Sequence, residues 1–163
     1  MLNPYASLLG SRPPLAVIAA TAGQLQALAA RLGPSGLEQP RAPGKWTARQ
    51  IFSHLADCEI AFGFRLRQAV AEERHTIQPF DQDLWARGYA HTRAEAALAA
   101  FLALRQWNVE FIERLAPAQL AKKVMHPDRG EMTVAVIVET MAGHDLNHLA
   151  QLETIAARPP AAK

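Results

Sequence analysis

The stretch from Thr47 to Glu73, TARQIFSHLADCEIAFGFRLRQAVAEE, has the period of a long amphipathic helix. Thr47 is a good N-cap, and Gln50 three positions later completes a capping box, with Trp46 before it as a hydrophobic staple. Side chains that recur at helical spacing, and so lie near one face, are Ile51, His54, Leu55, Cys58, Phe62, Leu66 and Ala69. The sequence therefore predicts a helix from Ala48 to about Glu73.

Three other segments carry the same pattern and are expected to be helices: Pro13 to Leu32, Arg93 to Leu115 and Val134 to Ala157. Gly33 and Pro34 should end the first, while Thr92 to Glu95 has the spacing of a capping box. The expected buried side of the third helix is broad: Ala97, Leu98, Phe101, Leu102, Leu104, Trp107, Val109, Phe111, Ile112 and Leu115. Thr133 should cap the last helix, and Pro159 and Pro160 should end it.

The connections between these helices are long. Residues 33–45 hold three prolines and three glycines, which is typical of a surface loop. Residues 75–91 contain apolar side chains, which suggests a loop that packs over the bundle. Asp128-Arg129-Gly130 indicates a tight turn in a short hairpin. Four long helices without a strand of useful length predict an all-α, four-helix-bundle domain over residues 1–163.

Composition excludes several classes of protein. A chain of 163 residues is expected to form one domain. Its single cysteine, Cys58, excludes an intramolecular disulfide and a Cys-rich zinc knuckle, and fits a reducing, cytoplasmic setting. No apolar run approaches the roughly 20 residues that span a bilayer, so we expect no membrane. The net charge is only +2 and basic residues are scattered, so we expect no nucleic-acid partner.

Histidines give the strongest indication of chemistry. His144 and His148 are four residues apart on the last predicted helix, so their side chains point the same way. Both continue the apolar stripe of that helix, and His54 lies within the stripe of its own. Burying three imidazoles is costly unless each finds a partner. One shared metal ion would satisfy all three; the alternative is that the histidines are structural and hydrogen-bonded within the core.

These residues resemble a known family. WTARQIFSHLADCE (46–59) and GHDLNHLAQL (143–152) resemble signatures of the DinB/YfiT-like metalloprotein superfamily. PFDQDLWA (79–86) and HPDRGEMT (126–133) resemble its connecting elements. The resemblance implies an up-down-down-up four-helix bundle, frequent homodimers, and a divalent transition metal, usually nickel or zinc. The metal-ligand positions of the family correspond here to His54, His144 and His148.

The superfamily includes thiol-dependent enzymes, so the resemblance implies a thiol S-transferase whose small-molecule substrate includes a low-molecular-weight thiol. Three histidine ligands leave open positions on the ion, as in catalytic sites. Such a position could bind a thiol or a water, which leaves a metal-dependent hydrolase as an alternative. A non-catalytic metal-binding or dimerisation module is the other. No catalytic side chain can be named from the sequence.

Several residues are candidates for supporting roles. Metal-bound imidazoles usually donate their other N–H to a carboxylate or carbonyl, so the side chains expected near the ion are Asp57, Asp145 and Gln151. Cys58 could reach the pocket, but a buried free cysteine usually behaves as a small hydrophobe. Candidates for the pocket mouth are Phe80, Asp81, Asp83 and Trp85, although Trp85 is also typical of a residue that staples a loop. Of the remaining histidines, His91 and His126 should make local hydrogen bonds, and His75 should be exposed.

Overall fold

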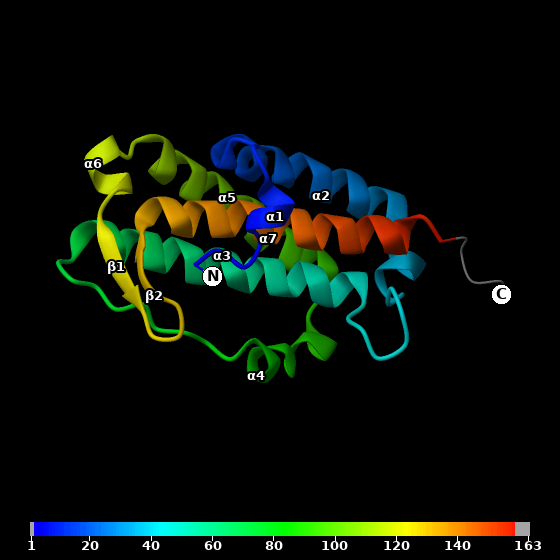
Figure 1. Ribbon diagram of the computed structural model, residues 1–163. Helices are drawn as coiled ribbons and strands as arrows, with labels where there is room; N and C mark the ends of the chain where they lie inside the picture. Colours follow the sequence, from blue (N-terminus) through cyan, green and yellow to red (C-terminus); the bar gives the residue numbers. More distant parts are fainter. Residues whose placement is uncertain (1, 159–163) are drawn as a thin grey trace.

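Four long helices form the body of the molecule (Figure 1). They are α2 (Pro14–Leu37), α3 (Ala48–Ala71), α5 (Ala94–Glu113) and α7 (Val134–Ala156). The structure is a computed structural model, and it describes residues 2–158. Pro159 and Pro160, the expected stop of the last helix, lie outside the described residues.

The helices run up, down, down and up (Figure 1). α2 packs against α5 and α7, and α3 packs against the same two helices from the other side. The long segment 72–93 returns the chain from the end of α3 to the far end of the bundle, where α5 begins (Figure 1). This crossover makes α3 and α5 parallel neighbours and places α3 diagonally across from α2. The predicted all-α, up-down-down-up bundle is confirmed.

Short elements fill the connections. They are α1 (Ala6–Leu9), α4 (Gln82–Ala86), the 3-10 helix η1 (Tyr89–His91), α6 (Pro117–Leu120), β1 (Lys123–His126) and β2 (Gly130–Thr133). β1 and β2 pair as an antiparallel hairpin in which His126 lies opposite Gly130. Gly130 has a positive φ of 82°, as the tight turn requires. The predicted hairpin is therefore present.

Helix boundaries follow the side-chain caps in two of three predicted cases. The Thr47–Gln50 capping box is formed, and Thr133 accepts a hydrogen bond from the Val136 amide. The capping box predicted at Thr92 is wrong, because α5 begins one residue later than expected and has Arg93 as its N-cap without a side-chain cap. The Thr92 hydroxyl instead lies 2.6 Å from that of Ser53 and donates to the Tyr89 carbonyl.

α2 is interrupted at Gly33, where the sequence predicted that the helix would end. Gly33 has φ 61° and ψ −179°, and a further helical turn from Pro34 to Leu37 follows it. By length and composition alone this helix is apolar enough to cross a membrane, although no apolar run of that length was expected from the sequence. Core helices pass the same test, and this one buries a stripe against α5 and α7: Ile18, Thr21, Leu25, Leu28 and Leu32.

The buried side chains form two apolar clusters, one toward each end of the bundle. One contains Phe62, Leu66, Ile137 and Met141, and the other contains Phe52, Leu55, Phe101, Leu149 and Leu152. A layer of buried polar side chains separates them, with members on all four helices: Thr21, His54, Glu59, Arg105, Asn108, His144, Asp145 and His148. The apolar ends hold the bundle together, and the polar layer carries the candidate site.

Two residues do not lie where the sequence placed them. Trp107 was expected on the buried side of α5 but is 62% exposed. His75 was expected to be exposed but is buried, with its Nδ1 2.9 Å from the Glu72 carboxylate. His126 makes the predicted local hydrogen bond, because its Nδ1 accepts from the Asp128 amide at 3.1 Å.

Candidate metal centre

The three histidines singled out in the sequence meet in the polar layer. α3 supplies His54, while α7 supplies His144 and His148 one turn apart. The ring centroids lie 5.1 Å apart for His54 and His144, 4.8 Å for His54 and His148, and 4.4 Å for His144 and His148. The Nε2 atoms of His54 and His144 face each other at 3.0 Å. The apolar stripes of the two helices thus correctly predicted that His54 and His144, which are 90 residues apart in the sequence, lie together.

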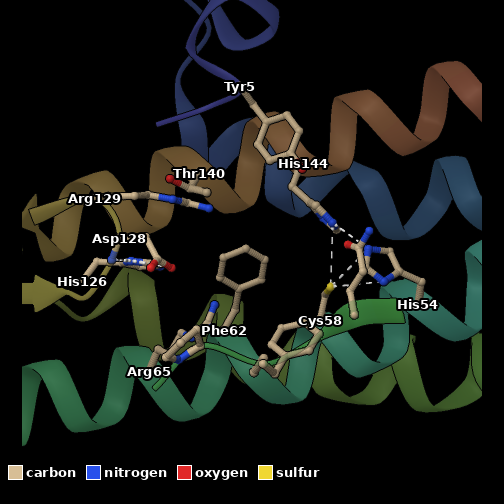
Figure 2. Close-up of a pocket in the computed structure, with 14 residues that line it drawn as sticks. Tyr5, His54, Cys58, Phe62, Arg65, His126, Asp128, Arg129, Thr140 and His144 are labelled. Atoms are coloured by element: carbon tan, nitrogen blue, oxygen red, sulfur yellow. Dashed lines mark hydrogen bonds and ion pairs between the residues drawn. The ribbon is translucent and has the colours of Figure 1, made fainter. Parts of the chain in front are cut away.

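Cys58 is closer to this centre than its sequence context suggested. Its Sγ lies 3.5 Å from Nε2 of His54 and 3.7 Å from Nε2 of His144 (Figure 2). The donor atoms of His54, Cys58 and His144 all lie within 4.8 Å of one another. The His148 ring packs at a steep angle beside the two imidazoles but does not belong to this tightest set of donor atoms. From the sequence, Cys58 was expected to behave as a small hydrophobe. Its position four residues after His54, one turn along the same helix, could have indicated a nearby donor atom.

Burial keeps the imidazoles neutral. Desolvation lowers the pKa of His54 to about 4. Desolvation also lowers the pKa of His148 to about 3, with His54 adding to the shift and Gln151 opposing it. The pKa of His144 is well below its usual value because of burial and the other two histidines. Neutral imidazoles carry the lone pair that a metal ligand needs. Burial raises the pKa of Cys58, so in the absence of a cation this side chain is a thiol.

The donor set fits a divalent transition metal. Zn–N bonds of about 2.0–2.1 Å and a Zn–S bond of about 2.3 Å that meet near tetrahedral angles separate the donors by about 3.3–3.6 Å. The separations here are 3.0, 3.5 and 3.7 Å. In addition, Nδ1 of His148 is buried without a hydrogen-bond partner among residues 2–158. A buried polar atom without a partner is costly, and a cation beside it would relieve that cost.

An ionic network lies directly behind the histidines. Arg105 donates to both oxygens of Asp145, at 2.5 and 2.9 Å, and to Glu59 at 2.6 Å. Asn108 donates to Glu59 as well. The expectation that Asp145 contacts an imidazole is wrong, because Arg105 takes both of its oxygens. No role for Arg105 was predicted from the sequence, yet it is only 2% exposed and binds Asp145, the residue next to His144.

The other supporting residues are divided between the site and the crossover segment. Asp57 accepts a hydrogen bond from the Tyr89 hydroxyl at 2.8 Å instead of from His54. Trp46 packs on both the His54 ring and the Tyr89 ring, at 4.9 and 5.9 Å. Gln151 is the one predicted neighbour that affects the pKa of an imidazole, which it raises at His148. The segment 75–91 therefore packs over the site, as its apolar residues indicated.

A cleft of about 240 Å³ opens onto the cluster. His54, Cys58 and His144 line one end of it, and Phe62 lies midway along (Figure 2). The ring of Tyr5, from the N-terminal segment, lies edge-on to His144 at 5.6 Å. The cleft gives a small molecule a route to the donor atoms.

The residues proposed for the pocket mouth separate in the structure. Phe80 lines the cleft. Asp83 lines a second cleft, together with His148. Asp81 caps α4 through the Asp83 and Leu84 amides, and Trp85 stacks on Phe80 at 4.5 Å, as a loop staple does.

Sequence comparison identifies the family. The sequence profile of the DinB superfamily matches residues 18–152, which include all of the donors described above. The chain belongs to the DinB superfamily. The resemblance predicted from the histidine motifs is thereby confirmed.

Relatives of this DinB-superfamily chain have names that mention a metal. A protein of Oceanobacillus iheyensis named "Putative metal-dependent hydrolase" is 30% identical over 116 residues, which are 71% of this chain and 67% of the relative. A protein of Bacillus mycoides with the same description is 28% identical over 75% of this chain and 71% of the relative.

A solved structure shows the same fold. YfiT from Bacillus subtilis, described as a probable metal-dependent hydrolase with an unusual four-helix bundle topology, superposes with a TM-score of 0.81. Its sequence is 23% identical, and the match covers 87% of this chain and 83% of YfiT. At this identity the likeness establishes the shared fold, including the crossover between α3 and α5.

Proposed function

We propose that this protein is a metal-dependent hydrolase that cleaves a small-molecule ester or amide. The observation that carries the proposal is the pair of neutral, buried imidazoles with facing Nε2 atoms 3.0 Å apart at the end of an open cleft. The names of the relatives from Oceanobacillus iheyensis and Bacillus mycoides support the same activity. Nickel or zinc is the proposed ion, since both accept imidazole ligands.

The proposed ligands are His54, His144 and His148, with the Cys58 thiol beside the first two in the wall of the cleft. Three neutral histidines bind without losing a proton, whereas the buried Cys58 thiol has to release one. His148 lies outside the set of donor atoms that are within 4.8 Å of one another, so an ion bound by all three histidines would require the His148 donor to move closer. Distances alone favour Cys58 as the third donor, so His148 and Cys58 are the two alternatives for that position.

The residues around the site have separable tasks in this proposal. When bound, the ion would polarise the scissile carbonyl and activate a water molecule. Tyr5 and Phe62 line the cleft beside the donors and would limit how a substrate enters. Arg105 holds the Asp145 carboxylate with two hydrogen bonds, which fixes the turn of α7 that presents His144.

Metal content tests the ligands. Protein purified without a histidine tag and loaded with Zn²⁺ or Ni²⁺ should retain about one ion per chain by mass spectrometry. His144→Ala should lose the ion, while the matched control His91→Ala, which removes an exposed histidine, should keep it. Comparing His148→Ala with Cys58→Ser identifies the third ligand, and loss of the sulfur-to-metal absorption of the Co²⁺ form in Cys58→Ser would assign it to the cysteine. Wild-type protein that retains no ion after loading would overturn the proposal.

Turnover separates hydrolysis from thiol transfer. We expect cleavage of aryl esters or amides that needs no thiol, stops with a chelator and is lost in His144→Ala. Thiol transfer is the second candidate, because Cys58 shows that sulfur can lie 3.5 Å from Nε2 of His54. Activity that depends on glutathione, bacillithiol or mycothiol would favour that candidate over hydrolysis. Tight metal binding without turnover in either assay would point to a non-catalytic module.

A further inference from the structure

The cleft has a second, cationic end. Opposite the histidines and Cys58 it is lined by Arg65 of α3 and by His126, Asp128 and Arg129 of the β1–β2 hairpin (Figure 2). Arg65 follows Cys58 by seven residues, which is two helical turns and about 10 Å along the axis. Both residues therefore line the same wall of the cleft.

Neither arginine is neutralised by a carboxylate. Among residues 2–158, the ion pairs within 4.0 Å include neither Arg65 nor Arg129. The half-buried Arg65 donates to the Gln78 carbonyl at 3.1 Å, and its guanidinium lies 5.5 Å from the Phe80 ring centroid. These contacts orient the guanidinium but leave its charge uncompensated. Arg129 is exposed on the hairpin turn.

The two guanidinium groups line the same end of the cleft. Burial lowers the pKa of Arg65; Cys58 opposes this shift, and the charge of Arg129 adds to it. Burial and Arg129 also lower the pKa of His126, which is therefore neutral. Because its Nδ1 accepts from the Asp128 amide, the neutral His126 ring carries its proton on Nε2. Like charges gathered at one end of a cleft favour an anionic ligand.

One carboxylate also lines this end. The Asp128 side chain is 77% exposed and its Oδ2 lies 4.0 Å from Nδ1 of His126. It reduces the local charge but is not paired with either arginine, so the end of the cleft keeps a net positive charge. Between this end and the metal donors the wall is apolar, with Phe62 as its main side chain (Figure 2).

We propose that Arg65 and Arg129 bind an anionic group of the substrate, a carboxylate or a phosphate, while an apolar middle part lies on Phe62 and the scissile bond reaches the donor end. This inference rests on the proposed hydrolase function for its reaction, but the anion site is defined by its own residues. Guanidinium groups match both anions through charge-assisted, bidentate hydrogen bonds. The substrate class is thus a small, amphipathic anion.

Equilibrium binding tests the site without turnover. Titration calorimetry would compare phenylacetate, its neutral isostere phenylacetamide and phenyl phosphate, each with metal-loaded and chelator-treated protein. We expect at least one anion to bind about tenfold more tightly than the amide, as a charge-assisted hydrogen bond allows. The tighter of the two anions identifies the group. Equal affinities for both anions and the amide would overturn the proposal.

Variants locate the preference. Arg129→Gln changes an exposed side chain and should reduce the anion preference at least about threefold without affecting folding. Arg65→Gln should reduce the anion preference more than Arg129→Gln does. Arg65→Lys, which keeps the charge, should retain part of the preference. Arg114→Gln is the matched control, since Arg114 is 79% exposed and lies at the C-terminal end of α5. A preference that survives in Arg129→Gln but disappears on chelation would place the anion on the metal and refute the site.

The outcomes separate the two proposals. If no hydrolysis is found but the anion preference depends on Arg129, the hydrolase proposal fails and the anion site stands. If chelator-sensitive hydrolysis is found but the anions bind no better than the amide, the anion site fails alone.

Discussion

At the scale of single residues, the most consequential side chain is Arg105. It is 2% exposed and forms ion pairs with two carboxylates that are equally buried, those of Glu59 and Asp145. Removing one partner of such a group leaves the others charged and uncompensated, which costs about 3–5 kcal/mol. We expect Arg105→Leu to lower the free energy of unfolding by about that amount in urea titrations.

The loss of stability expected for Arg105→Leu depends on the burial of its ion pairs. An exposed arginine, Arg114, provides the matched control. Arg114 forms an exposed ion pair with Glu110, and exposed pairs contribute about 0–1 kcal/mol. Arg114→Leu should therefore shift the urea midpoint little. If Arg105→Leu shifted it no more than this control, the network would not be a stabilising feature of the polar layer.

The buried histidines make the stability of the metal-free protein depend on pH. In the folded chain the pKa of His54 is lowered to about 4 and that of His148 to about 3, from an ordinary value of 6.5. Between pH 6.5 and about 4 the unfolded chain binds more protons than the folded chain at these two histidines. The contribution of the neutral imidazoles to stability is therefore complete above pH 6.5 and is lost as the pH falls. Each histidine should reduce the free energy of unfolding by about 1.4 kcal/mol per pH unit in this window.

Urea titrations of chelator-treated protein between pH 7.5 and 4.5 would measure that slope. His148→Phe should make it shallower by removing one of the shifted groups. His91→Gln, which removes an exposed imidazole, should leave it unchanged. A stability that stays constant from pH 7 to 4.5 would show that the imidazoles are not held neutral by burial.

The sequence was informative about single residues where helical spacing and residue type agreed. His54 and His144 were found because imidazoles stood within apolar stripes. Arg105 was missed because arginine is usually solvated, although it follows Phe101 by four and precedes Asn108 by three, and all three are buried. Cys58 was assigned to packing, because a buried free cysteine usually behaves as a small hydrophobe and sequence spacing cannot fix its distance to His144 on another helix.

At the scale of elements, the N-terminal segment owes its position to a glycine. A Cβ at Gly143 would lie 2.5 Å from the Cβ and 2.9 Å from the carbonyl oxygen of Tyr5. Both distances are too short, so Gly143→Ala should displace the segment that carries Tyr5 and α1 from α7. We expect faster amide hydrogen exchange in residues 2–12 and a less stable fold.

The control for this prediction is a glycine with open space around it. A Cβ at Gly23, in α2, would meet nothing within 4 Å. Gly23→Ala should therefore stabilise the protein slightly, by about 0.4–1 kcal/mol, through the unfolded state. Unchanged exchange in residues 2–12 of Gly143→Ala would mean that the N-terminal segment is not held by this close contact.

Local chemistry predicted the elements well where the decisive contacts were local. The Thr47 capping box, the break at Gly33 and the Gly130 turn each depend on neighbouring residues, and each is present. The cap at Thr92 failed because Ser53 on α3 competes for its hydroxyl. The positions of α1 and of Tyr5 beside His144 depend on tertiary contacts. No pattern in the first 12 residues predicts these contacts.

At the scale of the whole molecule, the topology followed from the family motifs, and the surface is where sequence reasoning erred most. Amphipathic periodicity places apolar side chains on a helix face but does not say which apolar residues stay exposed. Ile60, Phe64 and Trp107 are 52, 57 and 62% exposed. Ile60 and Phe64 are one turn apart on α3, and Arg67 of the next turn lies 5.5 Å from the Trp107 ring of α5. An apolar patch therefore extends across α3 and α5, and its residues are Ile60, Phe64 and Trp107.

The homodimer implied by the family resemblance would cover this α3–α5 patch. Exposed clusters of large apolar side chains are typical of protein interfaces, where aromatic residues contribute most of the binding energy. We expect sedimentation velocity to show a dimer at micromolar concentration and Phe64→Glu to weaken association by at least about tenfold. Leu84→Glu is the matched control, because Leu84 is 51% exposed but lies on α4, away from the patch. A monomer at all concentrations, or a dimer weakened by Leu84→Glu and not by Phe64→Glu, would contradict this assignment, and in the second case the crossover segment over the metal centre would be the interface instead.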